Sequence, residues 1–95
     1  MAFEERTYQN DGSYMRKLIS NMAEMQNWKI LPGGGPGEVR YRQTIYGLDH
    51  EYLVTVAESA GVSTVRVETD GGGEEVRRQF GMLEKFIALG GGGQG

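Results

Sequence analysis

The sequence predicts an α+β domain in which an antiparallel sheet of four to five strands carries two amphipathic helices on one face. Residues 38–46, 51–58 and 62–69 alternate apolar and polar side chains, which is the period of strands with one buried face. Residues 13–27 and 74–89 instead place apolar side chains three and four positions apart, as in a helix with one apolar stripe. Elements with a single apolar surface bury it against one another. With shorter strands near the N-terminus, the expected order is (β)-α-β-β-β-β-α.

The N-terminal third contributes a weak strand, a helix and a short strand. Residues 2–9 alternate poorly, so the sequence leaves open whether they join the sheet as an edge strand. Either Asp11 or Ser13 is placed to cap the first helix, because a short side-chain oxygen accepts a hydrogen bond from a free backbone N–H. Trp28, at the start of the 28–31 strand, is expected to close the core. The apolar stripe of the helix is Met15, Leu18, Ile19, Met22 and Met25.

The central strands form two hairpins, with turns expected at 47–50 and 59–61 and a glycine-rich loop at 32–37. These turns would pair Ile45 with Tyr52, Gln43 with Val54, Tyr41 with Val56, Tyr52 with Val67, Val54 with Val65 and Val56 with Ser63. Both hairpins then agree on the faces, which a slip of one residue would mix. The core face collects Tyr41, Gln43, Ile45, Tyr52, Val54, Val56, Val65 and Val67. The solvated face collects Arg40, Arg42, Thr44, Leu53, Thr55, Thr64, Arg66 and Glu68.

The second helix follows a loop at 71–73 and is expected to end before Gly90, a natural stop for a helix. Glu74 and Glu75 suit its N-terminus, where the helix dipole is positive. We expect one domain over residues 1–89 and a disordered glycine-rich tail over 90–95. The buried face of this helix is expected to be Val76, Phe80, Leu83 and Ile87, with Met82 and Phe86 beside it.

Composition excludes several classes of protein. The 95 residues contain no cysteine, which removes disulfides, thiolate nucleophiles and cysteine metal sites. The charged N-terminus does not resemble a signal peptide, and no stretch is apolar enough for a membrane span. A net charge of −3 does not favour binding to nucleic acid by bulk electrostatics. We therefore expect a cytoplasmic protein that has no membrane association and carries neither a metal nor a cofactor.

No set of residues predicts a named chemistry, so we do not expect an enzyme. His50 is the only histidine, and we expect it to lie exposed in a turn. The Glu4–Glu5 and Glu74–Glu75 pairs are neighbours in sequence, whereas hydrolases hold two acids across a cleft. The 71–73 glycine run lacks the lysine and the spacing of phosphate-binding loops.

The expected function is that of a non-catalytic interaction module, such as an accessory subunit, adaptor, chaperone-like or inhibitor protein. It would bind a protein partner, or a second copy of itself, through a strand edge or through the solvated face. The candidate residues on that face are Arg40, Arg42, Thr44, Thr55, Thr64 and Arg66. An alternative is a small-molecule site between helices and sheet near Tyr41, Gln43 and Tyr52, because a polar amide among core positions can line a cavity. A third is weak nucleic-acid binding by the arginines.

Overall fold

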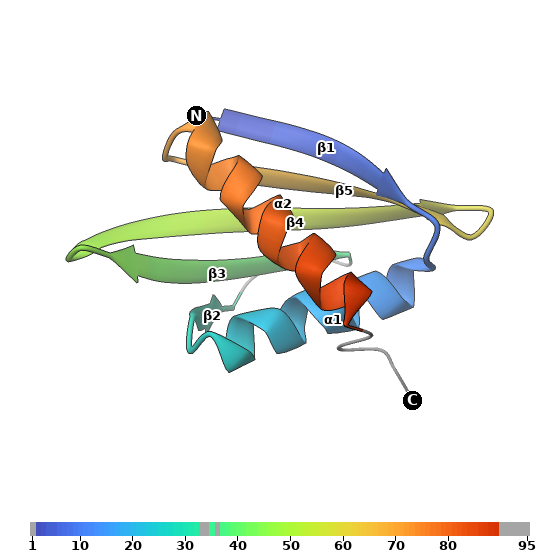
Figure 1. Cartoon of the computed structure of the whole chain (residues 1–95), viewed down its shortest axis with the longest axis horizontal. Coiled ribbons are helices and arrows are strands. Elements are labelled where there is room, and N and C mark those ends of the chain that lie inside the picture. The colour runs from blue at the N-terminus through green and yellow to red at the C-terminus, as the bar shows by residue number, and fades with distance from the viewer. Residues whose placement is uncertain (1, 33–34, 36, 90–95) are drawn as a thin grey trace.

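The computed structural model describes residues 2–32, 35 and 37–89, and within them the predicted α+β fold is confirmed. The strands are antiparallel and lie in the order β1-β5-β4-β3-β2 (Figure 1). The N-terminal strand, whose place the sequence left open, is a full member of the sheet. The expected tail and two of the loop glycines, at 33 and 34, lie outside the described residues. The elements are β1 (Ala2–Tyr8), α1 (Gly12–Met25), β2 (Lys29–Leu31), β3 (Glu38–Ile45), β4 (Leu48–Ser59), β5 (Val62–Thr69) and α2 (Gly73–Ala88).

Both helices pack on the same face of the sheet, and one apolar core lies between them and the strands. The expected core face is confirmed, except that Gln43 and Ile45 are only half-buried because they lie toward the tip of the β3–β4 hairpin. The members with less than a tenth of their surface exposed come from both helices and three strands. They include Met15, Leu18, Ile19, Met22, Tyr41, Tyr52, Val54, Val56, Val65, Val67, Val76, Phe80 and Leu83.

The expected hairpin pairings are wrong, although the faces are right. Tyr41 pairs with Tyr52 rather than Val56, and Val54 pairs with Val67 rather than Val65. The slips are four and two positions, and an even slip leaves every side chain on its own face. Likewise Ile45 pairs with Leu48, Gln43 with His50, Tyr52 with Thr69 and Val56 with Val65.

Both slips arise because the turns are two residues long and are centred elsewhere than expected, two residues earlier in the first hairpin and one residue later in the second. Tyr46 and Gly47 connect β3 to β4 with φ angles of 52° and 78°, and Ala60 and Gly61 connect β4 to β5 with 54° and 79°. Positive φ at both central positions defines the type I′ turn, whose twist matches that of the strands. Glycine supplies the second position without strain, while the first is held by a side chain with a Cβ. The longer turns expected from the sequence are therefore replaced by longer strands.

Helix α1 begins where the Asp11 carboxylate accepts a hydrogen bond from the Tyr14 N–H at 2.7 Å, so Asp11 rather than Ser13 is the cap. The helix ends at Met25, two residues earlier than expected. Met25 is 70% exposed, which corrects its expected place in the core, because the sheet below this last turn is reduced to the short strand β2. Trp28 follows directly and packs against the core, as expected.

Helix α2 begins after Gly72, whose N–H donates to the Glu75 carboxylate at 3.0 Å. This bond uses one of the free N–H groups at the helix start, and the acidic side chains Glu74 and Glu75 there complement its dipole. The expected buried face is confirmed for Val76, Phe80 and Leu83, but Ile87 is only half-buried. The structure adds Gln79, a polar side chain that is 1% exposed.

Candidate interaction surface

The six residues predicted for the solvated face lie together on the face of the sheet opposite the helices, which we call the open face. Arg40, Arg42 and Thr44 come from β3, where they pair with Leu53, Glu51 and Asp49. Register places the remaining three on the same face, with Thr55 paired to Arg66 and Thr64 paired to Ala57. Alternation along the strands keeps them away from the core.

Each arginine on the open face contacts a carboxylate, so this face is not basic. The Glu51 carboxylate lies 3.2 Å from Arg42 and 3.6 Å from Arg40. Arg66 lies 3.5 Å from Glu68 and 3.8 Å from Glu5. By register the face carries the cations Lys29, Arg40, Arg42 and Arg66 and the carboxylates Glu5, Glu38, Asp49, Glu51 and Glu68.

A row of five side chains crosses all five strands of the open face. The strand register aligns them as Phe3, Glu68, Leu53, Arg40 and Leu31. Phe3 is 57% exposed, and the Arg66 guanidinium lies 4.1 Å from its ring centre. Apolar and charged members therefore alternate along one line across the sheet.

A hollow of about 210 Å³ opens at Leu53, the middle member of this row. Arg40, Glu51, Glu68 and Asp70 stand around it. Leu53 is half-buried, so part of its side chain faces the hollow. An apolar floor with a charged rim is an arrangement that can take a side chain of a partner.

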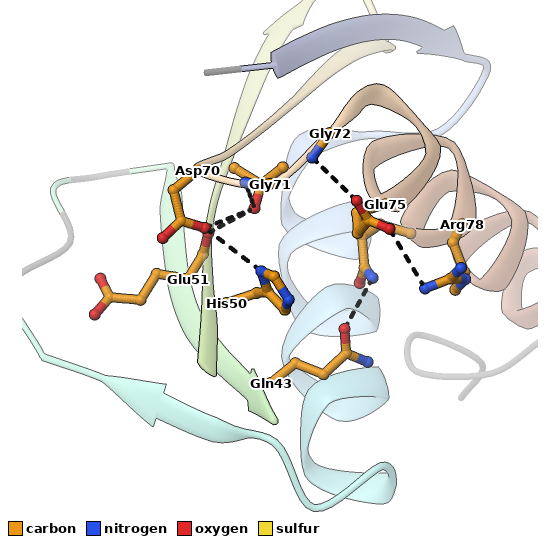
Figure 2. Close-up of polar contacts among 10 residues, drawn as sticks. Gln43, His50, Glu51, Asp70, Gly71, Gly72, Glu75 and Arg78 are labelled. Carbon is orange, nitrogen blue, oxygen red and sulfur yellow. Dashed lines mark hydrogen bonds and ion pairs between the residues drawn. The ribbon is translucent and has the colours of Figure 1, made fainter. Parts of the chain in front are cut away.

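On the opposite face, Tyr41 and Gln43 meet α2 through Gln79, and Tyr52 stacks beside Tyr41. The Tyr41 hydroxyl donates to Gln79 Oε1 at 2.7 Å, and Gln79 Nε2 donates to Gln43 Oε1 at 3.3 Å. Figure 2 shows Gln43 pointing toward α2, where the second of these bonds is drawn. Gln79 thus links Tyr41 and Gln43, and a ligand held between them would have to displace it.

The aromatic rings beside Gln79 form a stack of three. Trp28 lies on Tyr41 with a centroid distance of 4.9 Å, and Tyr41 lies on Tyr52 at 5.2 Å. Burial raises the pKa of the Tyr41 hydroxyl well above its usual value, and it also raises the pKa of Tyr52, with the Glu75 charge as a second cause. Both hydroxyls therefore stay protonated at neutral pH. Gln79 lies close enough to the Tyr52 hydroxyl to counteract this rise in pKa in part, but among the described residues no atom has the geometry of a hydrogen bond with that hydroxyl.

A second hollow, of about 420 Å³, lies at the outer side of β3 where the short strand β2 begins. Gln43 reaches it, but neither Tyr41 nor Tyr52 does. Of the three residues predicted for a ligand site, Gln43 is therefore the one that lines this hollow. Its walls are polar and are formed by Gln26, Asn27, Trp28, Lys29, Arg42, Gln43, Thr44 and Asp49.

His50 lies in strand β4, which corrects its expected place in an exposed turn. The cause is again the two-residue turn, which makes β4 begin at Leu48. Its side chain is 23% exposed, and Nδ1 lies 3.8 Å from the Asp70 carboxylate (Figure 2). Within the described ranges, no three His, Cys, Asp or Glu side chains are grouped to hold a metal ion.

Sequence reasoning missed Gln79 and Phe3. Gln79 lies three residues after Val76 and next to Phe80, a spacing that places it on the buried face of the helix. Its polar side chain hid this, because the buried face was identified from apolar residues alone. Phe3 belongs to the open face because β1 pairs with β5, and these two strands are separated in the sequence by the other three strands of the sheet. Leu31 joins the row for the same kind of reason, through its pairing with Arg40.

Over the part of the chain that the structure describes, no helix is long and apolar enough to cross a membrane. The chain matches no protein-family model, and no curated protein matches its sequence.

Proposed function

We propose that this protein is a non-catalytic interaction module that binds another protein through the open face of its sheet. The observation that carries the proposal is the row from Phe3 to Leu31, with the hollow over Leu53 at its middle. Protein interfaces combine a central apolar anchor with a charged and polar surround. The row has this composition, and Arg40 on one side of Leu53 and Glu68 on the other offer directed polar contacts.

The charge balance of the open face favours a protein over a nucleic acid. Binding to nucleic acid draws on unpaired cations that neutralise phosphates. Here Arg40 and Arg42 share Glu51, and Arg66 is held between Glu5 and Glu68. A phosphate would have to compete with these carboxylates. The alternative of a ligand between helices and sheet is weakened by Gln79, which bonds to both Tyr41 and Gln43.

The test is affinity capture of the tagged protein from its host's lysate after nuclease treatment, with two matched variants. Leu53→Ser removes the apolar floor of the hollow, while Leu48→Ser makes the same change on the same strand at a residue that is 65% exposed and lies on the other face. We expect one protein in stoichiometric amount, lost with Leu53→Ser and retained with Leu48→Ser. Melting curves of both variants establish that each is folded.

Two outcomes would contradict the proposal. One is a wild-type capture with no stoichiometric protein after nuclease treatment. The other is a partner that Leu53→Ser and Leu48→Ser retain equally. A partner lost on nuclease treatment, with affinity that falls steeply as salt rises, would indicate nucleic acid instead. A rise in melting temperature with a small molecule, abolished by Gln43→Ala, would favour the ligand alternative.

A further inference from the structure

Strand β1 leaves one complete edge of the sheet without a neighbour among the described elements. It pairs with β5 over all seven residues, and the strand order places nothing on its other side (Figure 1). Its outward backbone N–H and C=O groups are therefore available for pairing. The opposite edge differs, because β2 is only three residues long.

The β1 edge lacks several devices that keep strand edges apart. Its sequence, Ala-Phe-Glu-Glu-Arg-Thr-Tyr, contains no proline, glycine or lysine. Its register with β5 runs without a bulge from Ala2 to Tyr8. Proteins commonly protect edges with prolines, lysines, bulges or very short strands. Charged side chains are another such device, but those of β1 are already paired within the chain, Arg6 with Glu4 and Glu84 and Glu5 with Arg66. A regular edge of this length is a template for another strand.

We propose that the occupant of this edge is a second copy of the chain, paired antiparallel through β1 about a two-fold axis at Glu5. In that register all seven residues of each β1 are paired. Glu4 lies opposite Arg6 of the second copy, and Arg6 lies opposite its Glu4, so two pairs of opposite charge face each other across the new ladder. Opposite charges in directly paired positions stabilise a sheet.

The two neighbouring registers of the β1–β1 pairing, centred on Glu4 and on Arg6, place charges less favourably than the register centred on Glu5. A two-fold pairing keeps each side chain opposite one on its own face, so the register changes in steps of two residues. Centring the axis on Glu4 sets Glu4 against Glu4, and centring it on Arg6 sets Arg6 against Arg6. Each of these side chains also has an opposite charge within its own chain, Glu4 and Arg6 at 2.7 Å and Glu5 and Arg66 at 3.8 Å, so the like pair at the axis does not separate the registers. Centring on Glu5 sets Glu5 against Glu5, but of the three registers it alone adds pairs of opposite charge, Glu4 with Arg6 on either side of the axis. The Glu5 register is therefore the one that the strand's own charges select.

This dimer goes beyond the proposed function and does not depend on it. An axis perpendicular to the sheet keeps the helices of both copies on one side and makes a continuous sheet on the other. The hollow over Leu53 lies on β4, two strands away from the axis, and remains open. Loss of the partner and loss of the dimer are thus separate results.

Sedimentation equilibrium and single-cysteine cross-linking test the proposal together. The wild-type chain should change from the monomer mass to twice that mass as its concentration rises. Because the chain has no cysteine, each introduced thiol is the only one present. Glu5→Cys places two Cα atoms about 4.5–5.5 Å apart across the axis, which is within reach of a disulfide. We expect it to form a disulfide dimer under mild oxidation.

Thr7→Cys is the matched control on the same strand and face. In the Glu5 register its Cα atoms lie about 13 Å apart, four residues along the strand, so it should not form the disulfide. Ala57→Cys, exposed on the open face, should also stay monomeric under oxidation. A chain that remains monomeric at millimolar concentration would overturn the proposal. So would cross-linking of Thr7→Cys or Ala57→Cys as fast as that of Glu5→Cys.

Discussion

Two non-glycine residues, Tyr46 and Ala60, hold the left-handed backbone conformation that the type I′ turns require. This conformation costs an L-residue with a Cβ about 1–2 kcal/mol of conformational free energy, and it costs asparagine less because its short polar side chain can hydrogen-bond to the nearby backbone. Tyr46 is fully exposed, so its ring gains no burial in return. The sheet accepts this strain because the two-residue turns fix the register of all three central strands.

Relieving that strain should stabilise the fold. Ala60→Asn creates the Asn-Gly sequence preferred in type I′ turns. We expect it to raise the free energy of unfolding by about 0.5–1 kcal/mol, measured by urea denaturation. Ala60→Val is the control and should lower the same quantity, because a β-branched residue is poorly suited to positive φ. Equal stability of the two variants would show that the turn is not type I′ in solution.

The two stacked tyrosines differ in one respect, which is the partner of the hydroxyl. Tyr41→Phe leaves the buried Gln79 Oε1 without its donor and should lower the free energy of unfolding by about 1–2 kcal/mol. Tyr52→Phe removes a buried hydroxyl that has no partner among the described residues, and it should leave stability unchanged or raise it by up to about 1 kcal/mol. Thermal unfolding of both variants checks this. A larger loss for Tyr52→Phe would contradict the bonding pattern.

At the scale of elements, the Glu84 carboxylate of α2 makes the side-chain hydrogen bonds that connect this helix to β1. Glu84 accepts hydrogen bonds from the Arg6 guanidinium and from the Tyr8 hydroxyl, each at 2.8 Å. The Arg6 guanidinium also lies 4.7 Å from the centre of the Phe80 ring. The hydrogen bonds from Arg6 first, and from Tyr8 second, hold the pKa of Glu84 below its usual value of 4.5.

This lowered pKa sets the sign of a pH effect. A carboxylate with a lowered pKa in the folded state contributes stability that is present above pH 4.5 and is lost as the pH falls through the lowered value. Glu84→Gln should remove this acid-sensitive contribution, leaving a shallower loss of stability below pH 4.5 than in the wild type. Because the side chain is 44% exposed, the loss at neutral pH should stay below about 1 kcal/mol. Denaturant titrations at several pH values measure both.

The elements and their faces were predictable from the sequence, whereas the hairpin register was not. Periodicity of two or of three to four is a local property, so the helices and the central strands could be located from their own residues, whereas β1 alternates too poorly for that. Register depends on turn length, and Tyr46-Gly47 and Ala60-Gly61 lack the asparagine or aspartate that announces a type I′ turn. Because the register differs from the expected one by even numbers of residues, each side chain lies on its predicted face. The residues predicted for the candidate surface therefore still lie on one face.

At the scale of the whole molecule, the fold closes by bringing the first and last elements together. Arg6 and Tyr8 bond to Glu84 although 78 and 76 positions of the chain separate them from it. Strand β1 likewise lies beside β5, although four elements stand between the two strands in the sequence. The charge balance of the open face belongs to this scale too. Glu51 reaches Arg40 and Arg42 only in the observed register, and Glu5 reaches Arg66 only through β1. A prediction made strand by strand could therefore place the arginines on this face but could not identify the carboxylates that pair with them.

Removing β1 should consequently destabilise the whole molecule rather than fray one end. Deletion of residues 1–8 takes away both partners of Glu84 and exposes the edge of β5 from Ser63 to Thr69. We expect loss of a cooperative thermal transition and visible aggregation, because β5 is a regular strand of eight residues rich in β-branched side chains. Light scattering and circular dichroism measure these effects. A soluble truncated chain with an unchanged melting temperature would contradict this account.

The stacking of Trp28 on Tyr41 also gives the molecule an intrinsic optical reporter. Trp28 is the only tryptophan in the chain, and its ring is tilted only 13° from that of Tyr41. Tyr41 is fully buried in the sheet, while Trp28 follows the end of α1. Tryptophan emission, together with the tryptophan bands of the near-ultraviolet circular dichroism spectrum, therefore reports on the packing of the α1–β2 junction against the sheet without a label.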